Sequence, residues 1–146
     1  MQYSKLSVKA EYILKLELGD KIHDSILNFC EKEKITTAWI TGLGAIKDIS
    51  LGYYNLQTRQ YQFQKYAEIY EVMGLVGNVA LVDNKPFAHI HTSISDENNT
   101  TCSGHLEYAT VAVTLEVRLT AYSQVIERMF EQASGLKLLQ CESQLV

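Results

Sequence analysis

The alternation of hydrophobic and polar residues predicts a chain built mostly from β-strands. Residues 10–18 alternate over their second half, and residues 109–120 (ATVAVTLEVRLT) alternate most regularly. The other expected strands share β-branched, aromatic or alternating residues between turn-forming clusters. They are residues 36–41, 46–54, 61–65, 67–82, 87–95, 101–105 and 136–139.

Helical spacing occurs in two segments. Residues 21–34 place apolar side chains on one helical face, with acids and lysines on the other. Residues 124–132 predict a second, shorter helix with Val125, Met129 and Arg128 turned inward. About seven strands and two helices, joined mostly by short turns, predict an α+β fold with a largely antiparallel sheet.

Glycines interrupt two of the expected strands. Gly74 and Gly77 lie within a strand pattern and indicate bulges or a close approach of backbones. Gly42 and Gly44 are interpreted as a tight connection between two strands, because the residues that complete a phosphate-binding loop are missing. With 146 residues, the chain is expected to form one domain over positions 1–146.

Composition limits the classes of function. The net charge is −4 and no cluster of Lys and Arg occurs, which disfavours direct binding to nucleic acid. Three widely spaced cysteines argue against a disulfide framework. The N-terminal residues lack the apolar core of a signal peptide, and no apolar run is long enough to cross a membrane. A cytoplasmic protein is expected.

Three of the four histidines lie within seventeen positions of one another. His89 and His91 are two residues apart, so a β-strand would present both imidazoles on one face. The segment Asp96–Asn99 reads as a turn, and an antiparallel return strand would set His91 opposite Gly104 or His105. The pairing with His105 would bring the third imidazole to the same face, whereas a slip of one residue would send it to the other face. Three converging imidazoles can hold a zinc-like ion and leave a fourth position for water or a substrate.

Two carboxylates are candidates for a role beside the three histidines, and one cysteine and the fourth histidine are not. Glu107 shares strand parity with His105 and could hydrogen-bond a ligand or act as a base, whereas its simpler interpretation is a solvent-facing carboxylate. Glu71 has two open interpretations: it has the same role, or it faces outward from an alternating strand. Cys102 is three residues from His105 and should face the other way. His23 is expected on the exposed side of the first helix.

Six short motifs follow one another along the chain. They are ITGLGA at 40–45, LGYY at 51–54, YEVMGLVGN at 70–78, PFAHIH at 86–91, SGHL at 103–106 and EV at 116–117. With these motifs in this order, the chain resembles the plants-and-prokaryotes-conserved (PPC) domain family. The resemblance covers nearly the whole chain, and its one departure is Ser103, where the family often has a second glycine.

The resemblance implies a compact α+β fold that assembles as a homotrimer. It also implies a metal site, usually suspected to be zinc, at His89, His91 and His105. In plant members the domain follows an AT-hook and serves assembly and partner contacts, but this chain has no Arg-Gly-Arg-Pro hook and is similar to the stand-alone prokaryotic type.

Three functions are therefore expected in order. The first is a trimeric protein that binds a divalent metal, with Zn²⁺ as the expected ion and no membrane partner. The second is DNA binding or transcription-related assembly, suggested by the plant relatives. The third is a metal-dependent enzyme of unknown substrate that uses Glu71 or Glu107 as a base.

Overall fold

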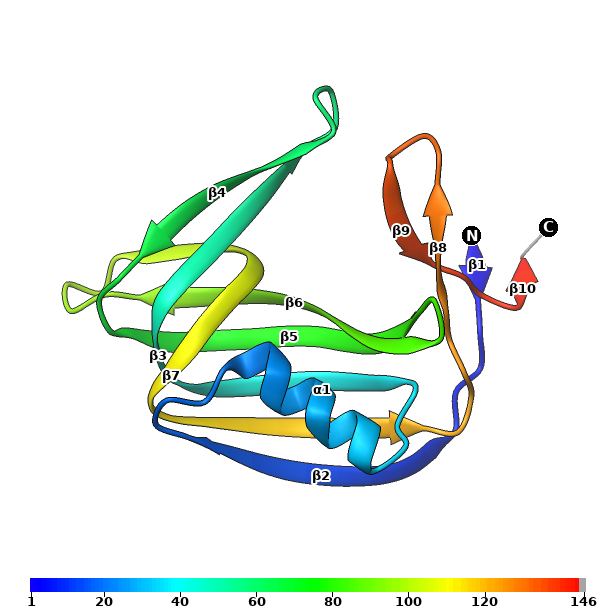
Figure 1. The fold of residues 1–146 in the computed structure, drawn as a ribbon, viewed down its shortest axis with the longest axis horizontal. Coiled ribbons are helices and arrows are strands. Elements are labelled where there is room, and N and C mark those ends of the chain that lie inside the picture. The colour runs from blue at the N-terminus through cyan, green and yellow to red at the C-terminus, as the bar shows by residue number, and fades with distance from the viewer. Residues whose placement is uncertain (145–146) are drawn as a thin grey trace.

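A computed structural model describes residues 1–144, and its centre is a six-stranded sheet with one helix packed on it (Figure 1). The sheet has the order β2-β7-β6-β5-β3-β4, and all of its neighbouring strands are antiparallel. The elements are β1 (Gln2–Tyr3), β2 (Val8–Glu17), α1 (Ile22–Lys32), β3 (Ala38–Asn55), β4 (Gln60–Tyr66), β5 (Tyr70–Val82), β6 (Lys85–Ser95), β7 (Thr101–Tyr122), β8 (Arg128–Glu131), β9 (Leu136–Leu139) and β10 (Ser143–Gln144).

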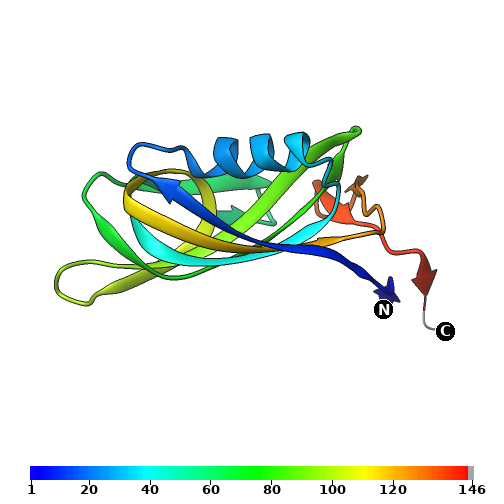
Figure 2. The same cartoon turned by 90° about the horizontal axis from the view of Figure 1, so that it is seen from below.

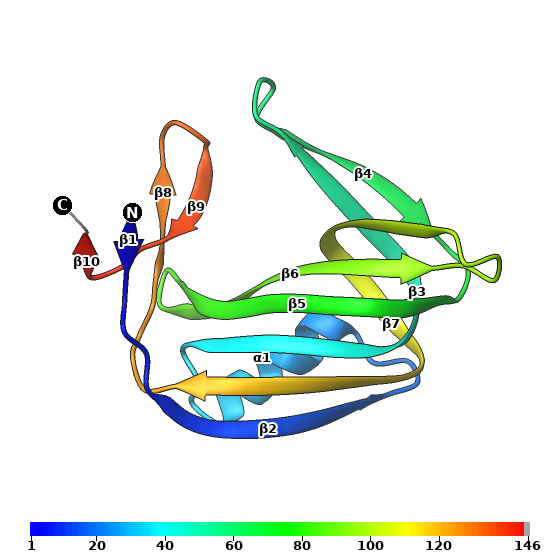
Figure 3. The same ribbon diagram turned by 180° about the vertical axis from the view of Figure 1, so that it is seen from behind.

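The long strands β3 and β7 close the sheet on itself. Besides its place in the main order, β7 also pairs with β3, so that β7, β6, β5 and β3 form a closed ring. Two small sheets lie at one end of the molecule, where β1 pairs with β10 and β8 pairs with β9 (Figure 3). The antiparallel sheet expected from the alternating pattern is confirmed.

The helix covers one face of the sheet, as the view in Figure 2 shows. Its apolar stripe of Ile22, Ile26 and Cys30 is buried against sheet residues such as Ile90 and Leu115. Burial raises the pKa of the Cys30 thiol to about 11, so this cysteine is a core residue and not a nucleophile.

Two predicted breaks in the strands were wrong. Gly42 and Gly44 lie inside β3, where a register shift marks a bulge and no connection between strands. Likewise, β7 runs without interruption through residues 106–108, which separate the two strands expected there. The prediction for β5 is confirmed, since the register shifts next to Gly74, and at Gly77 a Cβ atom would lie 2.4 Å from the His89 carbonyl oxygen.

The second predicted helix was also wrong. Within residues 1–144 there is one α-helix, and segment 124–132 contains β8, which forms a hairpin with β9. Val125 and Met129 are exposed, whereas Arg128 is buried as predicted. A helix would have needed both apolar side chains on an inner face, but backbone pairing across a turn at Gly135 (φ 75°) satisfies this segment instead. No helix in the described residues is both long and apolar enough to span a membrane.

Candidate metal centre

Adjacent antiparallel strands bring the three histidines together. His91 on β6 is directly opposite His105 on β7, and His89 lies two residues earlier on the same face of β6. The ring centroids are 5.0 Å apart for His89 and His91, 5.2 Å for His89 and His105, and 5.5 Å for His91 and His105. One nitrogen of each ring lies within 4.8 Å of the others. The register expected from the position of the turn is confirmed.

The geometry of the nitrogens suits a tetrahedral ion. The Nε2 atoms of His89 and His91 are 3.2 Å apart. Two imidazole ligands at zinc–nitrogen distances of about 2.05 Å in tetrahedral geometry would be separated by about 3.3 Å. The Nδ1 atom of His105 is buried and has no hydrogen-bond partner in residues 1–144. A donor set of three imidazoles with one orphaned buried nitrogen fits a divalent transition metal.

The surroundings keep two of the imidazoles neutral. Burial, followed by the positive charges of Arg128, His105 and His91, lowers the pKa of His89 to about 4. Burial and then the charges of His91, His23 and Arg128 lower the pKa of His105 to about 4. A metal binds the neutral ring, so these rings can coordinate an ion at neutral pH without first losing a proton.

A glycine makes room for the aromatic ring that supports His105. Gly52 on β3 is paired with His105, and a Cβ atom there would lie 2.7 Å from Phe63 Cε1 and 3.0 Å from Tyr61 Cδ1. The Tyr61 ring packs against the imidazole of His105 with centroids 5.0 Å apart. The close approach at Gly52 therefore lets β4 contribute a wall to the histidine cluster.

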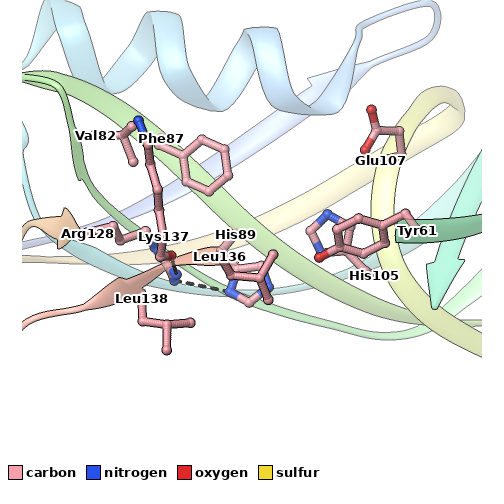
Figure 4. Close-up of a pocket in the computed structure, with 10 residues that line it drawn as sticks. All are labelled: Tyr61, Val82, Phe87, His89, His105, Glu107, Arg128, Leu136, Lys137 and Leu138. Atoms are coloured by element: carbon pink, nitrogen blue, oxygen red, sulfur yellow. Dashed lines mark hydrogen bonds between the residues drawn. The ribbon is translucent and has the colours of Figure 1, made fainter. Parts of the chain in front are cut away.

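Arg128 is the residue of this site that sequence reasoning missed. The residue is 8% exposed, and its Nη2 atom lies 2.9 Å from Asn78 Oδ1. The same Nη2 atom lies 3.1 Å from His89 Nδ1 (Figure 4). With His89 and His105 it lines a cavity of about 330 Å³. The sequence indicated only that Arg128 turns inward, and it did so as part of a predicted helix that does not form.

Of the other candidate residues, Glu107 lies at the cavity, whereas Glu71 and Cys102 lie outside the histidine cluster. Glu107 is exposed but lines the same cavity as His89 and His105, so its role as a base stays a prediction. Glu71 is exposed, is paired with Ser95 and lies outside the group of three histidines, which supports its outward interpretation. Cys102 packs against the core and faces away from His105, as expected.

The expected exposure of His23 was wrong. The residue is only partly exposed, and its Nδ1 atom is buried without a hydrogen-bond partner in the described part of the chain. Burial lowers the pKa of His23, and a charge on this residue would also lower the pKa of His105. His23 is nevertheless not one of the three rings that converge.

Solved structures and family models place the chain among known proteins. A plant- and prokaryote-conserved protein from Pyrococcus horikoshii is 33% identical, with a TM-score of 0.92 over 99% of this chain and 100% of that one. A metal-containing protein from Archaeoglobus fulgidus is 31% identical, with a TM-score of 0.90 over 96% and 99%. A Bacteroides thetaiotaomicron protein described as a candidate DNA-binding protein is 26% identical, with a TM-score of 0.87 over 94% and 99%.

Among curated proteins, none matches the chain. The family model of the Plants and Prokaryotes Conserved domain matches residues 3–123, a range that contains all three clustered histidines and ends before Arg128. This match covers most of the chain and agrees with the motifs around the histidines and the glycines of β3 and β5. The chain therefore belongs to the Plants and Prokaryotes Conserved (PCC) domain family.

Proposed function

We propose that this protein binds one divalent metal ion per chain, with zinc as the expected ion, through His89, His91 and His105. The observation that carries the proposal is the convergence of three imidazole nitrogens within 4.8 Å on one face of β6 and β7. The low pKa of His89 and His105 supports it, because protons compete little for these rings at neutral pH. The description of the Archaeoglobus fulgidus relative as metal-containing agrees with it.

The protein's own residues would hold the ion and shape the space beside it. The rings of His89, His91 and His105 would supply the ligands, and the Tyr61 ring restrains His105 by packing against it. A bound zinc ion would supply a Lewis acid. The cavity lined by His89, His105 and Arg128 lies beside these rings and can admit a small molecule.

Zinc binding is tested by titration of metal-free protein against a chromogenic zinc chelator. Wild-type protein should take up one zinc per chain, whereas His91→Ala and His105→Ala should each weaken binding by at least about 100-fold, because a site with two protein ligands binds zinc poorly. His23→Asn is the matched control, since it removes the fourth histidine and should leave zinc binding unchanged. Wild-type uptake far below one zinc per chain, or equal loss in the His23 variant, would contradict the proposal.

We further propose that the functional unit is a homotrimer. The face of the sheet opposite α1 carries exposed apolar side chains, among them Ile13, Leu43 and Val76. Strand register places Ile13, Thr41, Val76 and His91 in one cross-strand row together with Arg118. Exposed apolar side chains that share one face favour association with another protein surface.

Sedimentation equilibrium tests this assembly. The wild-type mass should be three times the 16.5 kDa of one chain. Leu43→Glu should lower it by placing a charge on the apolar face, while Leu56→Glu, in the exposed turn between β3 and β4, should not. A wild-type protein that sediments with the mass of one chain at micromolar concentration would rule out a stable trimer.

The two other expected functions receive less support. A relative is described as a candidate DNA-binding protein, but the net charge of −4 opposes phosphate contacts by this chain. A metal-dependent enzyme is favoured by one observation, the position of Glu107 at the cavity that His89 and His105 line. Glu107 could there take a proton from a molecule bound beside the histidines.

A further inference from the structure

We infer that the cavity beside the histidines binds a small organic carboxylate, with Arg128 as the residue that pairs with its carboxylate group. This inference deepens the proposed metal function, on which it rests for one step given below. Arg128 comes from β8, outside the residues matched by the family model.

The guanidinium of Arg128 is a buried positive charge without a carboxylate partner. No Asp or Glu in residues 1–144 lies within ion-pair distance of it. Its neighbours are neutral acceptors, Asn78 Oδ1 at 2.9 Å and the Lys137 carbonyl oxygen at 3.2 Å, and its buried Nε atom has no partner among the described residues. Burying an arginine is costly unless an anion compensates its charge, and here the cavity provides the space for one.

Metal binding would release one edge of this guanidinium. In a neutral imidazole, only one nitrogen carries a proton. Arg128 Nη2 can only donate, so His89 accepts at Nδ1 and carries its proton on Nε2, the nitrogen that faces His91. If Nε2 held a metal ion, the ring proton would lie on Nδ1, which could then not accept from Arg128. The N–H of Arg128 would then be free to donate to a ligand in the cavity.

The cavity favours a carboxylate attached to an apolar body. Its walls include the side chains of Val82, Phe87, Leu136 and Leu138, and the guanidinium carbon of Arg128 lies 5.8 Å from the centre of the Phe87 ring (Figure 4). A single guanidinium matches the two oxygens of a carboxylate. A phosphate group would require a second cation, but the nearby Lys137 is already paired with Asp83, with 2.6 Å between Nζ and Oδ2.

Calorimetric titration with benzoate, an apolar carboxylate, and benzamide, its uncharged counterpart, tests the inference. Zinc-loaded wild-type protein should bind benzoate at least about 10-fold more tightly than benzamide, and more tightly than metal-free protein does. Arg128→Met should weaken benzoate binding by about 10-fold or more. Arg59→Met is the matched control, because Arg59 is an exposed arginine in the turn between β3 and β4 and is not one of the residues that line the cavity. This variant should bind benzoate like the wild type.

A second variant keeps the inference testable if Arg128→Met fails to fold. Leu136→Trp fills the cavity while Arg128 stays in place, and it should also abolish benzoate binding but still take up zinc. The inference is overturned if benzoate binds no better than benzamide, or if both variants bind it like the wild type. Zinc uptake is measured first on the same samples, so a protein that binds zinc but not benzoate refutes this inference alone. A protein that binds no zinc refutes the metal function, and comparison of wild type with Arg128→Met then decides the carboxylate site separately.

Discussion

Gly44→Ala is expected to destabilise the domain by about 3 kcal/mol or more. Gly44 has a φ of 149°, which side chains rarely adopt, and a Cβ atom there would lie 2.1 Å from the Thr114 carbonyl oxygen and 2.8 Å from Leu115 Cα. Both contacts are with the backbone of β7, which cannot move away as the end of a flexible side chain could. The substitution should therefore separate β3 from β7 at the pairing that closes the ring of strands.

Gly74→Ala is the control for this prediction. Gly74 also lies at a bulge in a long strand, but nothing lies within 4 Å of its hypothetical Cβ atom. Its substitution should change stability by less than about 1 kcal/mol. Urea denaturation of the two variants and the wild type gives the comparison. Equal stabilities for the two variants would show that the close approach at Gly44 does not hold in the protein.

Saturation with zinc is expected to raise the unfolding free energy of the metal-free protein by about 4 kcal/mol at a free zinc concentration 1,000 times the dissociation constant. The ion would bind the folded arrangement of His89, His91 and His105, which the unfolded chain does not hold together. For a chain of this length, that gain corresponds to an increase in melting temperature of about 10 °C. Differential scanning calorimetry with and without zinc measures it.

The histidine variants separate this effect from general binding of zinc. His105→Ala should melt at nearly the same temperature with and without zinc, whereas His23→Asn should keep the full increase. Addition of a chelator should return the wild-type protein to its metal-free melting temperature. An increase that survives His105→Ala would mean that zinc stabilises the protein from another site.

The histidine cluster could be read from the sequence because its geometry depends on local rules. Side chains alternate along a strand, so His89 and His91 had to share a face. The turn at Asp96–Asn99 limited the partner of His91 to Gly104 or His105, and the structure pairs His91 with His105. Neither step needs information from distant parts of the chain.

Errors occurred where distant parts of the chain decide the structure. Residues 124–132 can satisfy a helical pattern, but two long-range contacts hold the segment extended. Arg128 contacts Asn78, fifty positions away, and the Leu81 N–H donates to the Ile126 carbonyl oxygen, so the segment pairs as the β8–β9 hairpin. Gly42 and Gly44 are typical of the end of a strand, but pairing with β7 keeps β3 continuous through them, with a bulge. Hydrophobic periodicity cannot predict such contacts, because it reports only on neighbouring residues.

The sequence by itself thus determined that the chain is rich in antiparallel strands, that it has the motifs of its family, and that His89 and His91 share one face of a strand. It allowed His105 to join them, and the structure decided the pairing of His105 with His91. Only the tertiary structure decided what surrounds them. It placed the Tyr61 ring on His105 and brought the buried charge of Arg128 to Nδ1 of His89. These contacts join β4 to β7 and β8 to β6, and long-range packing, not local spacing, sets them.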